Sequence, residues 1–303
     1  MARIFYDKAP VEIQVGTYRE TLIATDCSIN FNNSQSPIYS VGKKGPIGQF
    51  PSAARAGDMS FNFLTTITGS FDGIVGIGTA RQGNIINYLA DAIKNSTDSE
   101  ASGVIVKCAG VSGVGFLNSY SFNTTANSIS SSSAAFTLFG SGTQLPVSGR
   151  LSGISAGVGI GGTTSSTVTT GIAHGRFTTM PTSLNTKLYD DTTAENPATA
   201  TIYSADYSIS FNHNPLYKIG QEFPTTTFYT NASESLNVSE DLFNSGLKFD
   251  ESAADYNLEI KGLGGANLDG MFVRVKDAKQ ISTSASVGLD DIIRTQKSLT
   301  AVY

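Results

Sequence analysis

Apolar and polar residues alternate along several short stretches of the chain, which is the pattern of strands with one face turned to a core. The clearest case is Asp58–Leu64, where Met59, Phe61 and Phe63 fall on one face. The other strands predicted in the first half are Val11–Val15, Leu22–Ala24, Ser28–Phe31, Val104–Val106 and Ala135–Phe139. Between two of them, Lys43–Pro46 has the composition of a loop tip.

One segment of the first half has helical periodicity instead. Apolar side chains recur every three or four residues between Asn84 and Asn95, which predicts a helix with one buried face. In the second half, Glu240–Asn244 follows a potential cap at Ser239 and predicts a single helical turn. We therefore expect one short helix in each half.

The second half otherwise consists of short strands separated by turns. A glycine-rich tract from 140 to 175 predicts a linker or a long hairpin, and the acidic stretch Tyr189–Pro197 predicts a surface loop. The predicted strands are Thr199–Tyr203, Ser208–Phe211, Thr226–Tyr229, Ser235–Val238, Asn257–Lys261, Met271–Val275, Ser282–Val287 and Ser298–Tyr303.

The chain repeats one pattern at a distance of about 180 residues. Ser28–Asn32, Pro37–Gly42 and Phe50–Pro51 return in the same order as Ser208–Asn212, Pro215–Gly220 and Phe223–Pro224. A weaker echo links Gly115–Phe122 and Ile129–Ala134 to Gly270–Val275 and Ile281–Val287. Each pair is read as a strand, a turn and a second strand.

The repeat predicts a mainly β protein of two tandem sandwich or barrel domains, 1–170 and 171–303, although chance similarity in a Ser/Asn-rich chain is the alternative. A true duplication would place Phe31 over Phe211 and Tyr39 over Tyr217, in equivalent places in the two cores.

Composition narrows the classes of partner. Charged residues make up only 15% of the 303 residues, and Ser, Thr and Asn take their place, which suits a surface buried against neighbouring subunits. The net charge of −5 argues against tight binding of nucleic acid. Because no secretory signal and no membrane span are recognisable, we expect folding in a cytoplasm, with Cys27 and Cys108 as reduced, buried thiols.

Candidate chemistry is sparse, because the two histidines and two cysteines are widely separated in the sequence. His174 is expected in the glycine-rich tract and His213 in a turn. Gly149–Gly153 lacks the spacing of a nucleophile elbow, and Gly157–Gly162 lacks the helix that a dinucleotide fingerprint requires.

Two acidic pairs, Asp190–Asp191 and Asp290–Asp291, are read as solvated turns, with calcium ligands or glycosidase carboxylates as the alternatives. We expect no catalytic, cofactor-binding or metal-binding residues, and no enzymatic activity.

The repeated strand, the Pro-x-Tyr-x-(Val/Ile)-Gly segments Pro37–Gly42 and Pro215–Gly220, and the following strand Gly57–Phe61 resemble tail tube proteins of tailed bacteriophages. The resemblance implies tube-like β domains, each with one flanking helix, that assemble into stacked rings around passing DNA. A doubled tube domain implies three chains in a pseudo-hexameric ring, contacts with other tail proteins, and a place in the virion tail.

The glycine-rich tract and the short second helix depart from that pattern. The alternatives are another phage structural β protein (neck, baseplate or capsid decoration), a carbohydrate-binding module, or a hydrolase.

Overall fold

The protein is mainly β, as the alternation predicts. The computed structural model describes residues 11–15, 18–22, 24–32, 35–51, 56–65, 69–70, 82–95, 103–108, 111–125, 130–139, 181–190, 202–219, 224–241, 254–262, 270–286 and 294–303. The first half contains β1 (Val11–Val15), β2 (Tyr18–Leu22), β3 (Ala24–Asn32), β4 (Gln35–Tyr39), β5 (Pro46–Pro51), β6 (Ala56–Leu64), β7 (Gly69–Ser70), β8 (Gln82–Gly83), α1 (Ile85–Asn95), β9 (Val104–Cys108), β10 (Val111–Thr125) and β11 (Ser131–Phe139). The second half contains β12 (Pro181–Asp190), β13 (Ile202–Leu216), β14 (Thr226–Asp241), β15 (Ala254–Gly262), β16 (Gly270–Ser286) and β17 (Arg294–Val302).

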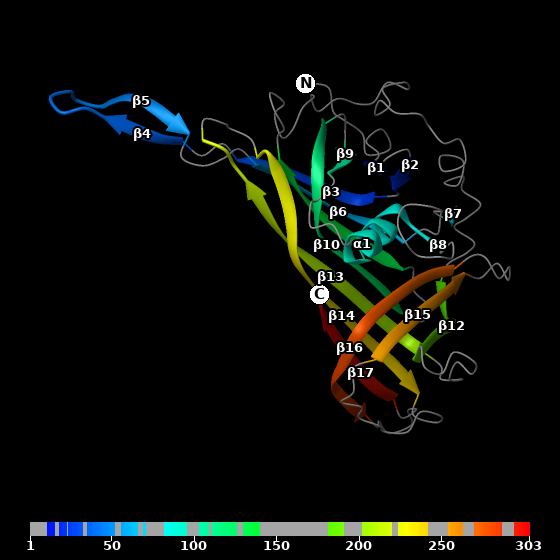
Figure 1. Ribbon diagram of the computed structural model, residues 1–303. Coiled ribbons are helices and arrows are strands. Elements are labelled where there is room, and N and C mark those ends of the chain that lie inside the picture. The colour runs from blue at the N-terminus through cyan, green and yellow to red at the C-terminus, as the bar shows by residue number, and fades with distance from the viewer. Residues whose placement is uncertain are drawn as a thin grey trace.

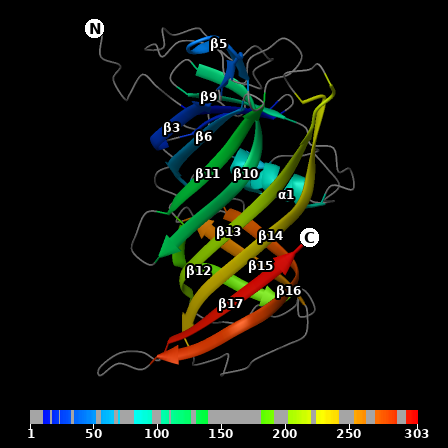
Figure 2. The same ribbon diagram turned by 90° about the vertical axis from the view of Figure 1, so that its left-hand side faces the viewer.

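Thirteen strands form one antiparallel sheet that folds back on itself (Figure 1). Eight of them lie side by side across one layer in the order β3, β6, β11, β10, β13, β14, β17 and β16 (Figure 2). β12 and β15 lie behind this layer and are reached through the first part of β16. One cluster of buried apolar side chains runs through both halves of the chain.

The two halves pair their strands in the same order. In the first half the order is β1, β9, β10, β11, β6, β3, and in the second it is β12, β15, β16, β17, β14, β13. β10 and β16 occupy the same position in the two orders. The first part of β10 pairs with β9 and its second part with β11, and the first part of β16 pairs with β15 and its second part with β17. A direct β10–β13 pairing joins the halves. The predicted division near residue 170 lies outside the described residues and stays a prediction.

Buried and exposed residues alternate as predicted in β6 but not in β1. Met59, Phe61 and Phe63 are buried while the residues between them are exposed, which confirms the expected alternation. All five residues of β1 are buried, so the alternation of the sequence does not correspond to an exposed face in this strand. Buried Glu12 is neutralised by Arg19 at 2.7 Å and by Lys107 at 3.6 Å.

The predicted helix of the first half is confirmed as α1, and its start is capped twice. The side-chain oxygen of Asn84 accepts hydrogen bonds from the backbone N–H of Ile86 (3.1 Å) and Asn87 (2.8 Å). A carboxylate oxygen of Glu20 accepts the N–H of Ile85 at 2.7 Å, which also places a negative charge at the positive end of the helix dipole. The apolar face of α1 packs into the core.

The helical turn predicted in the second half is wrong for the residues of it that the structure describes. Ser239, Glu240 and Asp241 belong to β14, where they pair with Gln296, Thr295 and Arg294. The partner strand satisfies their backbone groups, so the local capping signal is overridden; residues 242–244 lie outside the described residues.

Two protruding hairpins contain the repeated Pro-x-Tyr segments. The first arm, residues 35–51, is a separate two-stranded hairpin that projects from the body (Figure 1), with Lys43 and Lys44 in its turn. The second arm is the far end of the β13–β14 hairpin, where Leu216 pairs with Thr226. In the first arm Gly42 (φ 84°) and Gly45 (φ 105°) take the left-handed conformations that the predicted turn requires.

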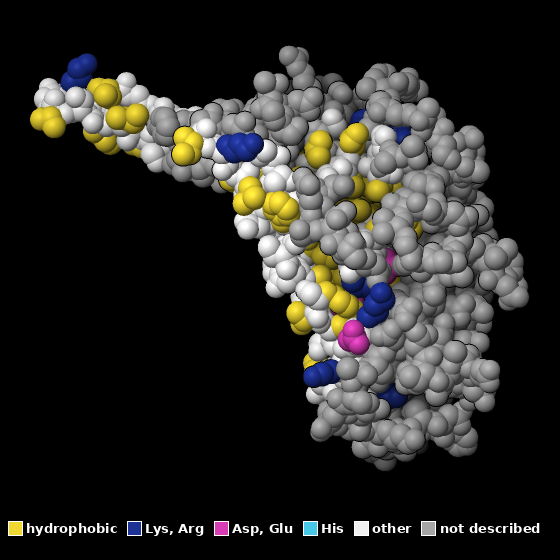
Figure 3. Space-filling model, viewed as in Figure 1, with side chains coloured by type: hydrophobic (Ala, Val, Ile, Leu, Met, Phe, Trp, Pro, Cys, Tyr) yellow, Lys and Arg dark blue, Asp and Glu magenta, His cyan; other side chains and the backbone are white. Residues whose placement is uncertain are grey.

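The prediction that the four repeated aromatic residues lie in the core is wrong for three of them, which are exposed. Tyr39 is 67% exposed and Tyr217 is 42% exposed, because both lie on the arms. Phe31 and Phe211 do lie on corresponding strands, β3 and β13, yet Phe31 is 42% exposed whereas Phe211 is buried. The apolar side chains of the first arm stand out from the body in Figure 3.

Several strands are longer than predicted, because cross-strand pairing continues through polar residues. Thr226–Tyr229 and Ser235–Val238 are parts of β14, and Met271–Val275 and residues 282–286 are parts of β16, with no turn between them. Tyr189 and Asp190, predicted in a loop, belong to β12. The glycine-rich tract and residues 191–197 lie outside the described residues.

Candidate functional site: the polar face of the sheet

The eight-strand layer has one exposed face on which small polar side chains predominate. Strand register fixes which residues lie beside one another across the sheet, since directly opposite residues point to the same side. One row crosses all eight strands and contains only polar residues: Asp26, Asn62, Ser133, Ser121, Ser208, Ser235, Thr300 and Lys279. We call this surface the polar face.

Many of these side chains hydrogen-bond to their direct neighbour on the next strand. Hydroxyl pairs are Ser28–Ser60 (2.7 Å), Ser121–Ser133 (2.8 Å), Ser208–Ser235 (2.7 Å) and Ser210–Ser233 (2.7 Å). The amide of Asn62 donates to Asp26 at 2.7 Å, and that of Asn123 donates to Asp206. Each hydroxyl pair uses one of its two donors and one of its four acceptor sites, so this face keeps hydrogen-bonding capacity for water and is hydrophilic without a strong single binding point.

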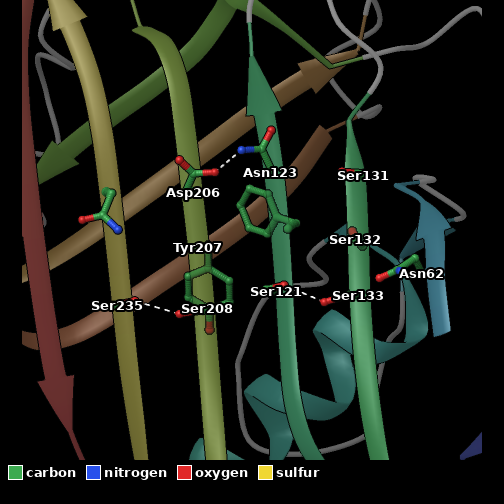
Figure 4. A pocket seen from close by; sticks show the side chains of 12 residues that line it. Asn62, Ser121, Asn123, Ser131, Ser132, Ser133, Asp206, Tyr207, Ser208 and Ser235 are labelled. Atoms are coloured by element: carbon green, nitrogen blue, oxygen red, sulfur yellow. Dashed lines mark hydrogen bonds between the residues drawn. The ribbon is translucent and has the colours of Figure 1, made fainter. Parts of the chain in front are cut away.

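A shallow hollow of about 360 Å³ lies in the middle of the polar face. Figure 4 shows its Ser and Asn side chains pointing in from adjacent strands, with Asn123–Asp206, Ser121–Ser133 and Ser208–Ser235 hydrogen-bonded across it. Asp206 is the one carboxylate among the lining residues, and no cation lies beside it in that lining. A single carboxylate without a second acid, base or nucleophile offers no arrangement for general acid–base or covalent chemistry.

Charge on the polar face is sparse and mixed. Asp26, Asp58 and Asp206 are exposed on its first five strands, and Lys279 and Arg294 are exposed at the β16–β17 end. Tight phosphate binding requires clustered Lys and Arg, and the described residues of the polar face contain no such cluster.

Beneath this face, a buried carboxylate connects the helix of the first half to the second half. Glu234 accepts hydrogen bonds from Lys94 of α1 (3.0 Å), the Tyr207 hydroxyl (2.5 Å) and the Tyr303 hydroxyl (2.6 Å). Burial raises the pKa of Tyr207 well above its ordinary value, and the neighbouring charge of Glu234 raises it further. This network was not predicted from the sequence. The signal in the sequence was that Glu234 shares the core-facing phase of Ala232 and Leu236, which indicates a buried carboxylate.

The two cysteines are far apart in sequence, as noted above, but adjacent in space. The Cys27 and Cys108 side chains hydrogen-bond, which raises the pKa of the Cys27 thiol and lowers that of Cys108; burial and nearby charge raise the Cys27 pKa further. Both are free thiols; Cys108 is buried, as expected, and Cys27 is partly buried.

The histidine expected in a turn lies in a strand. His213 of β13 packs edge-on against Tyr229, with ring centroids 4.8 Å apart, and against Phe116 at 6.2 Å. Burial lowers the pKa of His213. His174, both glycine motifs, Asp191 and the pair Asp290–Asp291 lie outside the described residues; Asp190 lies in β12.

Within the described ranges, no group of three or more His, Cys, Asp or Glu is placed to hold a metal ion. In the same part of the chain, no helix is long and apolar enough to cross a membrane. No family model matches the sequence, and no curated protein matches it at a significant level.

Proposed function

We propose that the protein is a structural subunit of a bacteriophage tail tube, which assembles into stacked rings around the DNA path and has no catalytic role. The observation that carries this proposal is the polar face: eight adjacent strands crossed by a row of polar residues, with Ser, Asn and Asp side chains hydrogen-bonded to one another across β3, β6, β11, β10, β13 and β14. Such a surface attracts water but holds no ligand strongly, which is what the wall of a conduit requires.

The number of strands supports a wide ring. β-Barrels of roughly 16–18 strands already enclose an aqueous channel. Three copies of an eight-strand layer would give a barrel of twenty-four strands. With strands about 4.8 Å apart and tilted by about 40°, the backbone diameter would be roughly 45–50 Å. Such a barrel leaves an open lumen after its side chains are placed.

The charge supports free passage of DNA. The chain has a net charge of −5, and the exposed carboxylates Asp26, Asp58 and Asp206 lie on the polar face. Facing the lumen, this surface would repel phosphate weakly and would neutralise few phosphates.

The two arms support stacking of rings. Val41 and Ile219 lie at corresponding positions of the repeated segments, and both are fully exposed at their arm tips. The first arm also exposes Ile38, Tyr39 and Ile47, and such groups of exposed apolar side chains are typical of surfaces that become covered on assembly. In a stacked tube, each arm would reach a neighbouring ring, and the tail and the virion would be the protein's location.

Negative-stain electron microscopy tests the proposal, combined with retention of duplex DNA by the assembled protein. We expect tubes or stacked rings that retain no DNA at low salt. Discrete small oligomers would favour another virion component, and monomers stabilised by a sugar would favour a carbohydrate-binding module. Tubes that bind DNA tightly, with affinity falling steeply as salt rises, would overturn the conduit assignment.

A charge variant tests which face lines the lumen. Asn237 is exposed on the polar face, so tubes of Asn237→Lys should retain DNA in a salt-dependent way. Gln49 is exposed on the first arm, and Gln49→Lys serves as the matched control that adds the same charge elsewhere. Equal DNA retention by the two variants would exclude the polar face as the lumen wall.

A further inference from the structure

The junction between the two halves is a strand pairing that the chain makes with itself. β10, from the first half, runs antiparallel to β13, from the second half. Ser121 lies opposite Ser208 and Asn123 lies opposite Asp206, so the rows of the polar face cross the junction without interruption.

The equivalents of these two strands lie at the two ends of the eight-strand layer. β16 occupies in the second half the position of β10, and β3 occupies in the first half the position of β13. Figure 2 shows β3 and the second part of β16 at opposite edges of the layer. Among the described residues, β3 pairs only with β6, and residues 279–286 of β16 pair only with β17.

Core-facing residues at both outer edges are less covered than their equivalents at the junction. Phe31 of β3 is 42% exposed, whereas its equivalent Phe211 of β13 is 5% exposed. On the other edge, Ala285 of β16 is exposed, whereas its equivalent Thr124 of β10 is buried. Each outer edge therefore resembles one side of the junction from which the neighbouring strand has been removed.

We propose that β16 of one chain pairs with β3 of a second copy of the same chain, in the register of the β10–β13 junction. The pairing orders make Ser282 equivalent to Ser121 and Ser28 equivalent to Ser208, so Ser282 lies opposite Ser28 of the second copy. The contact is head-to-tail, and such a contact gives a ring when its repeated rotation closes on itself. This inference rests on the proposed function, since it names the surface through which the subunits of a ring meet.

The side chains at this contact repeat the chemistry of the junction. Within the chain, the Asn123 amide donates to Asp206. At the contact the equivalent pair is Ser284 and Asp26, a hydroxyl donor facing a carboxylate. Asp26 already accepts one hydrogen bond from Asn62, and a carboxylate can accept several. Both edges would thereby gain the backbone partners that exposed strands otherwise lack.

Cysteine cross-linking tests the register. In a background with Cys27→Ala and Cys108→Ala, the pair Ser28→Cys and Ser282→Cys should form disulfides between chains, seen as a ladder on a non-reducing gel. Directly opposite antiparallel residues have Cα atoms about 4.5–5.5 Å apart, within the range of a disulfide. The control pair Ser28→Cys and Ser286→Cys is displaced by about 13 Å along the strand and should not cross-link.

A third pair verifies the geometry within one chain. Ser121→Cys and Ser208→Cys should form a disulfide without any ladder, because these residues face each other across the junction. Equal ladders from the in-register and displaced pairs would overturn the proposed register.

A charge variant tests the contact without cysteines. Lys279 would lie opposite Asn30 of the second copy, and Asn30 is exposed in the chain. Asn30→Lys should therefore raise the concentration needed for assembly several-fold while leaving the thermal melting of the monomer unchanged, and adding Lys279→Glu should restore assembly. Unchanged assembly of Asn30→Lys would overturn the contact.

The outcomes separate this inference from the proposed function. Tubes that form without the in-register cross-link overturn the edge contact and leave the tube proposal standing. Cross-linked rings that never stack support the edge contact and overturn the tube proposal. Monomers that neither cross-link nor assemble overturn both.

Discussion

Replacing Lys94 by Met should destabilise the protein strongly, because it leaves the carboxylate of Glu234 buried without its cation. The Lys94 ammonium lies 3.0 Å from Glu234, and both side chains are almost completely buried. At an effective dielectric constant of about 20, attraction over this distance is about 5.5 kcal/mol. Removing one partner of a buried pair typically costs about 3–5 kcal/mol. Because Tyr207 and Tyr303 still donate to Glu234, we expect the lower end, about 3 kcal/mol.

Urea unfolding at pH 7, followed by circular dichroism, measures this loss as a lower midpoint at unchanged slope. Lys44→Met, at the exposed tip of the first arm, is the matched control and should change stability by less than about 0.5 kcal/mol. The double variant Lys94→Met with Glu234→Gln should recover much of the loss, because no buried charge then remains unpaired. A loss below about 1 kcal/mol for Lys94→Met, or no recovery in the double variant, would refute the reasoning.

Three further predictions concern groups beneath or beside the sheet. Burial lowers the pKa of His213, so stability should fall as pH drops below about 6.5, and thermal melts of His213→Phe should lack this dependence. Burial raises the pKa of Tyr120 to about 12. The protonated hydroxyl therefore contributes fully to the free energy of unfolding below about pH 10, and this contribution is lost as pH rises towards 12. Tyr120→Phe should therefore show a shallower alkaline loss in urea titrations. Asn84→Ala should cost about 2 kcal/mol in urea unfolding, because the two capping hydrogen bonds that Asn84 accepts and its hydrogen bond to Tyr120 disappear, while Asn84→Ser should cost less.

Periodicity within a short window predicted the elements whose buried face depends on neighbouring residues in the sequence. The period of two in Met59, Phe61 and Phe63 gave the buried face of β6 correctly, and the helical spacing gave α1. The strands were divided too finely where polar residues interrupt the alternation. β14 continues past the register shift at Thr230 because pairing with β13 resumes on both sides of it, at Tyr229 and at Asn231, and no local window contains that information.

The candidate site depended on contacts between distant segments. The polar face exists because register aligns serines from eight strands, and the β10–β13 pairing joins residues 79 to 91 positions apart. Cys27 and Cys108 meet for the same reason. Periodicity indicates which side chains point outward from a strand, but it does not indicate which strands become neighbours, so the composition alone suggested a polar assembly surface without locating it.

The unequal arms have a consequence for the symmetry of a tube built from this chain. The first arm is an independent hairpin, whereas the second is only the far end of β13 and β14. A ring of three chains would therefore present long and short arms alternately, and rotation by a sixth of a turn would exchange unlike arms. Successive rings could then lock only in orientations that repeat every third of a turn, so the duplicated chain would select one helical stacking where six identical domains would allow two.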